Sequence, residues 1–349
     1  MPEGERIITY SAALNEALRE EMERDSSVFI MGEEVAVWGD GGGVFGVTKG
    51  LAATFGTHRV RNTPISEEGI VAIAVGSALT GLRPVVELMY GDFLTLAMEP
   101  LVNQAAKMRY MSGGQAKVPL VLRSNIGASG GKAAQHSQSL ESWIVHVPGL
   151  KLVVPSTPYD AKGLLKTAIR DDNPVVFFEH KLLYFTKGSV PQEEYTIPFG
   201  TAVIRRPGIH ATVVATQAML FKCLKVAEKL DREGVKLEVI DPRTLVPLDI
   251  ETIVESVKRT NRLLICHEAV ERGGWAAEIA MAAMVQAFDY LDAPIMRVCG
   301  KSLPIPYSST LEEVVIPSEQ ELIAAVRLLL SGQGFPAETD SNVSIEQLQ

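Results

Sequence analysis

Short apolar runs typical of buried strands alternate with longer amphipathic stretches typical of helices along most of this chain. Residues 28–31 and 175–179 show the first pattern, and residues 11–24 and 159–170 show the second. Because parallel strands are joined through helices, this alternation predicts an α/β fold built on parallel sheets. Further helices are expected at 47–55, 70–81 and 93–110, and further strands at 85–89, 118–123 and 151–155.

The alternation is interrupted once, between residues 186 and 208, where three prolines and scattered glycines occur without sustained periodicity. A chain of 349 residues, 46% of them apolar, is long enough for two hydrophobic cores. We therefore expect domains at 1–190 and 209–332, a linker at 191–208 and a loose tail at 333–349. In the second half, strands are expected at 211–215, 236–240, 263–266 and 295–298, and helices at 219–233, around 250–257 and at 275–287.

Charge and hydropathy exclude several classes of protein. The net charge is −9 and no stretch supplies a concentrated basic face, so a nucleic-acid partner is not expected. No uncharged apolar run reaches the length of a membrane span, and the N-terminal residues resemble neither a signal nor a transit peptide, which predicts a cytoplasmic protein. Cys223, Cys266 and Cys299 lack metal-ligand spacing and are expected to be reduced thiols.

Two glycine motifs match known patterns only superficially. Gly41, Gly43 and Gly46 satisfy G-x-G-x-x-G, but the nearest expected strand ends ten residues earlier, whereas a dinucleotide site needs an adjacent strand. The same loop contains Gly39-Asp40-Gly41, which resembles the start of the magnesium motif of thiamine diphosphate enzymes. Only Asn62 follows it, where paired asparagines at a longer spacing are expected. A complete magnesium site is therefore not expected in this chain.

Glu67 and Glu68 stand directly before residues 70–82, which contain no ionisable side chain. Free N–H groups at a helix N-terminus can account for both carboxylates. Adjacent helix positions point about 100° apart, so one glutamate can instead point inward while the other stays in solvent. A buried carboxylate is costly without a partner, which marks the inward glutamate as a candidate functional group.

His136 is the histidine most suited to chemistry, because it follows the glycine-containing loop 127–131 and precedes an expected helix. An ordinary loop histidine, hydrogen-bonded to the backbone, is the alternative. No two histidines have the spacing of a zinc site, since His136 and His146 are ten residues apart.

Several segments in the correct order resemble the β subunit of thiamine diphosphate-dependent 2-oxo acid dehydrogenases, the family of pyruvate, branched-chain 2-oxo acid and acetoin dehydrogenases. The resemblance extends from about residue 7 to residue 330. It implies a transketolase-like fold, with a pyrimidine-binding domain followed by a transketolase C-terminal domain. The segments are Arg61-Asn62-Thr63-Pro64-Ile65-Ser66-Glu67-Glu68-Gly69, Gly81-Leu82-Arg83-Pro84, Tyr110-Met111-Ser112-Gly113-Gly114, Ala134-Gln135-His136-Ser137-Gln138 and Asp160-Ala161-Lys162-Gly163-Leu164.

The resemblance also implies roles for individual residues. Glu67 would hydrogen-bond nitrogen 1′ of the cofactor's aminopyrimidine, a role that suits a buried glutamate because desolvation raises its proton affinity. His136 would contact substrate-derived groups and assist acyl transfer to lipoamide. The other cofactor-binding positions implied are Glu33, Ile65, Ser66, Met89 and Phe93, and Tyr90 joins His136 as a substrate contact. A surface acid is the alternative for Glu33, and core packing is the alternative for Met89 and Phe93.

Metal sites are implied in two places. Members of the family hold potassium largely through backbone carbonyls, here those of Leu120, Ala168, Ile169, Asp171 and Asn173, and oxygen ligands suit such a cation. Magnesium would be held by the α subunit together with the cofactor's diphosphate.

By this resemblance the chain is expected to act as the β subunit of an α2β2 enzyme with a site completed at the subunit interface. The enzyme would decarboxylate a 2-oxo acid or cleave acetoin and reductively acylate the lipoyl group of an acyltransferase core. The sequence does not choose among pyruvate, a branched-chain 2-oxo acid and acetoin. A noncatalytic scaffold subunit and a homodimeric transketolase-like enzyme are the alternatives.

Overall fold

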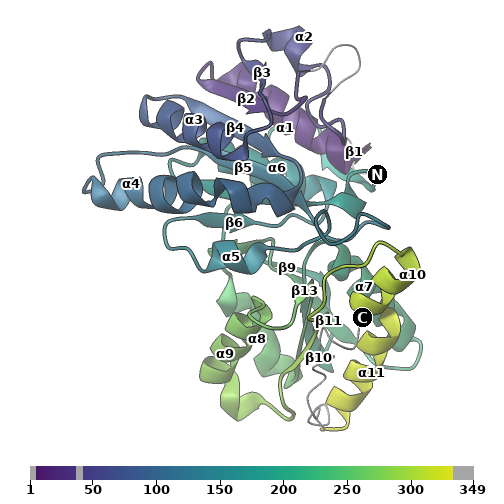
Figure 1. Cartoon of the computed structure of the whole chain (residues 1–349). Helices are drawn as coiled ribbons and strands as arrows, with labels where there is room; N and C mark the ends of the chain where they lie inside the picture. The colour runs from purple at the N-terminus through teal and green to yellow at the C-terminus, as the bar shows by residue number, and fades with distance from the viewer. Residues whose placement is uncertain (1–4, 37–41, 333–349) are drawn as a thin grey trace.

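A computed structural model of the chain describes residues 5–36 and 42–332, and two parallel sheets organise it (Figure 1). The upper sheet in Figure 1 has seven strands in the order β12-β6-β7-β5-β4-β2-β3. All neighbours in it are parallel except β12, which pairs antiparallel with β6. Its strands are β2 (Val28–Gly32), β3 (Val60–Asn62), β4 (Arg83–Leu88), β5 (Val121–Ile126), β6 (Lys151–Val153), β7 (Val175–His180) and β12 (Thr244–Val246).

The second sheet has five strands in the order β14-β13-β10-β11-β9, of which only β9 runs antiparallel to its neighbour. A separate antiparallel pair joins β1 (Glu5–Thr9) to β8 (Lys187–Pro191). The predicted α/β class with two parallel sheets is confirmed. The five strands are β9 (Val203–Arg206), β10 (Ala211–Ala215), β11 (Leu237–Asp241), β13 (Leu263–Val270) and β14 (Met296–Gly300).

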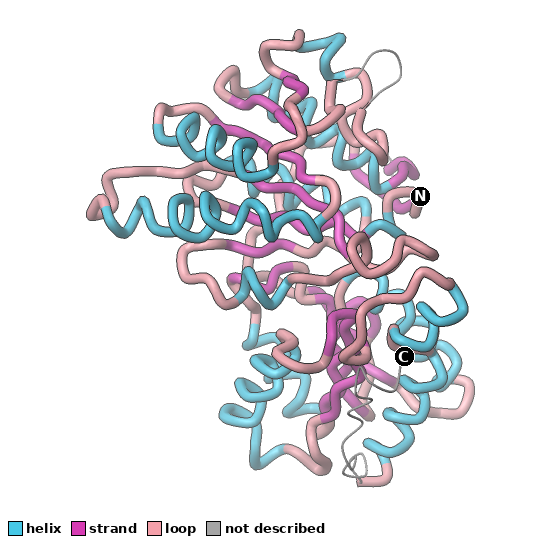
Figure 2. The backbone as a smooth tube through the Cα atoms, viewed as in Figure 1, coloured by secondary structure: helices cyan, strands magenta, loops and turns pink. Residues whose placement is uncertain are grey.

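Helices cover both faces of each sheet, as Figure 2 shows. Side chains alternate along a strand, so Val28 and Ile30 belong to the core beneath α1 and α6, whereas Phe29 and Met31 belong to the core beneath α3. The helices of the first half are α1 (Tyr10–Arg24), α2 (Leu51–Phe55), α3 (Glu67–Leu79), η1 (Gly91–Ala97), η2 (Glu99–Ala105), α4 (Ala106–Met111), α5 (Glu141–Val145), α6 (Pro158–Arg170) and η3 (Lys181–Leu183).

In the second half, α7 and α11 pack on one face of the sheet and α8 and α9 on the other. The core beneath α8 and α9 is continuous with the core beneath α3, so apolar packing joins the two halves. These helices are α7 (Gln217–Asp231), α8 (Ile250–Thr260), α9 (Ala276–Ala287), η4 (Phe288–Tyr290), α10 (Ser309–Val315) and α11 (Glu319–Leu330). None of the helices in the described part of the chain is both long and apolar enough to cross a membrane.

The structure corrects several expected elements. The single helix expected at 93–110 is instead η1, η2 and α4, because Pro100 enters at the start of η2 and cannot donate a backbone hydrogen bond. The helix expected at 47–55 begins only at Leu51, after Gly50 with a left-handed φ of 76°. The irregular stretch at 186–208 contains β8 and β9.

Several elements have no counterpart in the expectations, among them β1, β3, α10, α11 and β12. α11 begins at a capping box between Ser318 and Glu321, a recognisable start signal. α10 precedes it, and β12 brings a segment of the second half into the first sheet. The expected tail at 333–349 lies outside the described residues.

Candidate active site

The two glutamates at the start of α3 lie in different environments. Glu67 is only 6% exposed, whereas Glu68 is exposed to solvent. The expected inward and outward orientation is therefore confirmed, with Glu67 as the inward residue. No described residue donates a hydrogen bond to the Glu67 carboxylate. A buried carboxylate in this state is costly unless a ligand or a partner chain supplies the missing interaction.

Glu33 follows β2 and lies near Glu67. Burial is the larger cause that raises the pKa of Glu33, and the charges of Glu67 and Glu34 add to it. The structure thus brings together two of the acids singled out in the sequence, although they are 34 residues apart (67 − 33). A pair of close carboxylates holds a proton more readily than either does alone.

Three aromatic side chains from two segments meet beside β4. The His136 ring lies edge-on to the ring of Tyr90, with centroids 5.0 Å apart, and edge-on to Phe93 at 5.4 Å. Tyr90 precedes η1 and Phe93 lies within it, and η1 packs against α3. His136, Tyr90 and Phe93 are all partly exposed, so a ligand can reach the rings.

The glycine loop after β2 packs against Met89. A side chain on Gly43 would lie 2.6 Å from Glu87 Oε1 and 3.9 Å from Met89 Sδ, so the loop approaches β4 closely. Gly43 and Gly46 both have positive φ and shape this loop, which is a structural role rather than a dinucleotide fingerprint. Gly41 lies outside the described residues.

Beneath this loop lies a buried charged network. Arg123 donates to Glu87 at 2.6 Å and to Glu179 at 2.7 and 2.8 Å, and the Tyr184 hydroxyl donates to Glu179 at 2.6 Å. Burial raises the pKa of Glu87, against the opposing effect of Arg123. Phe45 of the glycine loop stacks on Tyr184 with centroids 4.2 Å apart. Sequence reasoning missed this network, although charged residues inside otherwise apolar strands were a visible signal.

Ile65 and Ser66 lie at the surface of the chain. Both are exposed, and the Ile65 side chain is 80% exposed, at the surface next to Glu67. The exposed side of α3 continues with Ile73, which is 59% exposed, and with Gly76, where an added Cβ would meet no described atom within 4 Å. A surface of this kind is suited to close approach by another chain.

Further buried polar groups adjoin the rings. Asp92 accepts hydrogen bonds from the backbone N–H and the side-chain amide of Gln138 through Oδ1, both at 3.0 Å. Its Oδ2 is buried and has no partner among the described residues, and the same holds for the hydroxyl of Ser137. These atoms retain hydrogen-bonding capacity beside His136. Asp92 was not singled out in the sequence.

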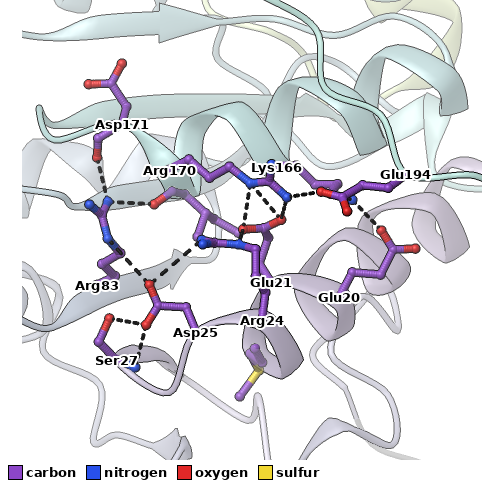
Figure 3. Close-up of polar contacts among 12 residues, drawn as sticks. Glu20, Glu21, Arg24, Asp25, Ser27, Arg83, Lys166, Arg170, Asp171 and Glu194 are labelled. Carbon is purple, nitrogen blue, oxygen red and sulfur yellow. Dashed lines mark hydrogen bonds and ion pairs between the residues drawn. The ribbon is translucent and has the colours of Figure 1, made fainter.

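Two of the carbonyls expected to hold potassium face an arginine (Figure 3). Arg83 Nη1 donates to the carbonyl oxygens of Ile169 at 2.9 Å and Asp171 at 3.0 Å, so these two oxygens converge on one cationic group. The Leu120 carbonyl accepts from the Val175 N–H, and the Ala168 carbonyl accepts from the Asp171 N–H. A carbonyl oxygen has two lone pairs, so these groups fit a cation as additional ligands but are not free.

The charged cleft between α1 and α6 in Figure 3 has a structural role rather than a ligand-binding one. Most of its acidic and basic groups are paired with each other: Arg170 donates to Glu21 and Glu194, and Lys166 contacts Glu20. Such pairing fixes α1 against α6 and leaves little charge for a ligand. The cleft has a volume of about 270 Å³ and is lined by Glu20, Glu21, Glu23, Arg24, Lys166, Arg170, Gln192 and Glu194.

Asn62, considered above as part of a magnesium motif, has a structural role. Its Oδ1 accepts the backbone N–H of Ala36 at 2.7 Å and so fixes the end of the segment after β2. Residues 37–41, which include Asp40, lie outside the described part of the chain. Within the described part, no three His, Cys, Asp or Glu side chains are grouped to hold a metal ion. The three cysteines are free thiols.

Comparisons with known proteins agree with this architecture. The chain matches the family described as Transketolase, pyrimidine binding domain over residues 6–187, and Transketolase, C-terminal domain over residues 200–322. A solved structure titled "Split gene transketolase, inactive beta4 tetramer" superposes with a TM-score of 0.75, covering 93% of this chain and 99% of that one. At 21% identity this likeness shows the fold alone.

Two curated relatives extend over nearly the whole chain. One is the Pyruvate dehydrogenase E1 component subunit beta of Rickettsia felis, 49% identical over 320 residues, which are 92% of this chain and 97% of the relative. The other is the Acetoin:2,6-dichlorophenolindophenol oxidoreductase subunit beta of Cupriavidus necator, 46% identical over 334 residues, covering 94% and 98%. The chain therefore belongs to the family of pyruvate and acetoin dehydrogenase E1 β subunits, oxidoreductase subunits with a transketolase-like fold.

Proposed function

We propose that this chain is the β subunit of an α2β2 thiamine diphosphate-dependent 2-oxo acid or acetoin dehydrogenase. The observation that carries the proposal is the buried Glu67 carboxylate, which lacks a hydrogen-bond donor among the described residues and lies near Glu33. A ring nitrogen of the cofactor would supply the missing partner. When bound, the cofactor supplies the electron sink for cleaving the bond next to the substrate carbonyl.

In this proposal the residues of the chain have distinct tasks. Glu67 would hold a proton shared with the cofactor's aminopyrimidine, and Glu33 would lie beside it as a supporting acid. Phe93 and Met89 would pack on the pyrimidine ring, and Ile65 and Ser66 would line its rim. Tyr90 and His136 would contact the substrate, with His136 moving a proton as the acyl group passes to a lipoyl acceptor.

A partner chain would complete the site. The exposed Ile65 and Ile73 and the open space at Gly76 support association along α3, directly beside Glu67. We assign magnesium and the cofactor's diphosphate to an α subunit, because Asn62 is already bonded to Ala36. The lipoyl-bearing acyltransferase core would be the second partner. The domain boundaries at 191–208 and a cytoplasmic location remain predictions.

We also propose a structural potassium ion beside Arg83. Its ligands would be the backbone carbonyls of Leu120, Ala168, Ile169, Asp171 and Asn173. Oxygen-only coordination at backbone carbonyls suits a large monovalent cation. The melting temperature of the assembled enzyme should be higher in potassium chloride than in choline chloride at equal ionic strength, because the ion binds only the folded state. Equal melting temperatures would remove potassium from the proposal.

The deciding experiment is coexpression of this chain with its α partner, followed by turnover assays. Pyruvate, branched-chain 2-oxo acids and acetoin are tested with thiamine diphosphate, magnesium and an artificial electron acceptor, and then with a lipoyl domain. We expect turnover only when both chains are present. Turnover by this chain alone would show a self-sufficient transketolase-like enzyme. Unchanged turnover of an assembled Glu67→Gln variant would identify a noncatalytic scaffold subunit.

A further inference from the structure

The loop of residues 127–138, here called the His136 loop, is held at both ends by the first half of the chain. The Gly127 N–H donates to the Gln138 carbonyl at 3.1 Å and closes the loop. Lys181 Nζ donates to the Gly127 carbonyl at 2.9 Å, and Asp92 accepts from the Gln138 N–H at 3.0 Å. Lys181 also lies over the Tyr90 ring, with Nζ 5.2 Å from the centroid, so the base of the loop adjoins the aromatic cluster.

The middle of the His136 loop is held by the second half of the chain. Glu312 accepts from the Gly130 N–H at 2.8 Å through one carboxylate oxygen and from the Gly131 N–H at 3.1 Å through the other. Both glycines have positive φ, of 78° and 79°, which turns successive N–H groups toward one anion. Glu312 is only 5% exposed and lies on α10, at the edge of the lower half that faces the upper half in Figure 1.

A second carboxylate from the same half reinforces this contact. Glu268, near the end of β13 and 8% exposed, accepts the Ala128 N–H. Its other oxygen lies 3.1 Å from His180 Nε2. Because the Leu182 N–H donates to His180 Nδ1, the imidazole proton resides on Nε2 and is donated to Glu268. Although burial acts to raise it, His180 and the Ala128 N–H lower the pKa of Glu268, which keeps this carboxylate ionised.

The loop packs on this imidazole without spare space. A side chain on Gly127 would lie 2.2 Å from His180 Nε2, so only glycine allows the approach. The three N–H groups at Ala128, Gly130 and Gly131 therefore donate to carboxylates that belong to another sheet and another helix. Hydrogen bonds to buried ionised groups are stronger than those between neutral groups. The loop's conformation thus depends on where the second half lies.

We propose that Glu312 and Glu268 are positioning residues through which the second half of the chain fixes His136 against Tyr90 and Phe93. Neither carboxylate lies among the proposed cofactor contacts, and both act through the loop backbone. The catalytic consequence rests on the function proposed above for His136. The structural part of the proposal, that these two carboxylates order the His136 loop, does not depend on the proposed function.

Hydrogen–deuterium exchange of the full chain assembled with its α partner tests whether the two carboxylates order the His136 loop. Glu312→Ala should speed exchange in peptides covering residues 127–138 by about tenfold or more, because hydrogen bonds to a charged acceptor are lost. Glu313→Ala, an exposed neighbour on the same helix, is the matched control and should leave exchange unchanged. Unchanged exchange in Glu312→Ala would overturn the proposal. If Glu312→Ala fails to fold, Glu268→Gln decides by the same readout.

Kinetics test the catalytic consequence. In Glu312→Ala, acyl transfer to a lipoyl domain should fall toward the level of His136→Ala, while thiamine diphosphate affinity and reduction of an artificial acceptor stay near wild type. Combining Glu312→Ala with His136→Ala should cause no loss beyond that of His136→Ala, since the carboxylate acts through the histidine. Fully additive losses would overturn the positioning role. A wild-type complex without lipoyl-dependent turnover would instead refute the proposed function. The exchange result would still show whether Glu312 orders the His136 loop.

Discussion

Burial and the neighbouring charge of Glu67 together hold the pKa of Glu33 above its usual value, so these two acids lie close enough for the charge of Glu67 to act on Glu33. Glu68, one residue further on, is exposed and does not contribute to this shift. The sequence Glu67-Glu68 therefore offers a matched pair of variants, in which the same change is made to a buried and to an exposed carboxylate.

Glu67→Gln should lower turnover of the assembled enzyme about 100- to 10,000-fold, because a glutamine cannot share the proton that the proposed role requires. Glu68→Gln should leave turnover near wild type. Steady-state kinetics with an artificial electron acceptor measure both, and gel filtration with the α partner shows that each variant assembles. Equal effects of the two substitutions would contradict the assignment of Glu67.

His136→Gln should reduce lipoyl-dependent turnover about 100-fold or more, the usual contribution of a proton-transferring side chain. Reduction of an artificial electron acceptor should fall much less, since that assay needs no acyl transfer. His146→Gln serves as the control because His146 is exposed and makes no contact with the ring cluster. The assignment would be lost if His136→Gln reduced both activities by the same factor.

Glu141 gives the chain a stability that depends on pH. Burial, with a contribution from the charge of Glu268, raises the pKa of Glu141 to about 7, and its Oε2 has no described partner. The folded state binds this proton more tightly than the unfolded state, so ionising the buried carboxyl destabilises the fold. As the pH rises from about 4.3, the pKa of an unfolded glutamate, to about 7, the free energy of unfolding of the wild type should decrease relative to that of Glu141→Gln. Above about pH 7 the difference between the two proteins should stay constant.

Melting temperatures of wild type and Glu141→Gln over this range check the prediction. Glu68→Gln, which removes an exposed carboxyl, is the matched control. Parallel curves for wild type and Glu141→Gln would show that Glu141 does not titrate in this window.

Arg123→Met should destabilise the chain by about 3–5 kcal/mol, because it leaves Glu87 and Glu179 buried without their common partner. Tyr184→Phe removes only the single hydroxyl bond to Glu179 and should cost about 1.5 kcal/mol. Urea unfolding followed by circular dichroism compares the two. A smaller loss for Arg123→Met than for Tyr184→Phe would contradict the central place of Arg123 in the network.

Gly76→Ala should stabilise the isolated chain by about 1 kcal/mol, since alanine is the better helix former and its Cβ would meet no described atom. Gly76→Leu should instead weaken association with the α partner, because a large side chain would occupy the proposed contact surface. Thermal unfolding measures the first effect and analytical ultracentrifugation of the mixed subunits measures the second. Undisturbed association of Gly76→Leu would place the partner elsewhere.

The sequence predicts most of the fold because the strands are apolar on both faces. Residues such as Phe29 and Ile30 must both be covered, which requires helices on each side. Of the segments that escaped prediction, α11 carried a recognisable capping box at Ser318 and Glu321, whereas β12 carries little local signal. The strand Thr244–Val246 is short and is followed by Pro247, so its pairing with β6 follows from the arrangement of the two halves rather than from its own composition.

Site residues were predictable from the sequence where their burial leaves a local pattern. Those whose role depends on contacts between distant segments were not. Glu67 was recognisable because it precedes an uncharged segment, and residue types alone do not distinguish Glu312 from its exposed neighbour Glu313. Glu268 follows the apolar strand residues 263–266 and offered a weak signal of burial. Its contact with Ala128 spans 140 positions, which no local pattern conveys.

The pairing of Thr244–Val246 with β6 has a consequence for synthesis on the ribosome. The first sheet emerges from the exit tunnel long before the segment that completes its edge. Until Val246 has been translated and released, the edge of Lys151–Val153 opposite β7 faces solvent with unpaired hydrogen-bonding groups, the condition under which strands pair with the wrong chain. The nascent first half therefore cannot finish its sheet alone, and the two halves must complete folding together.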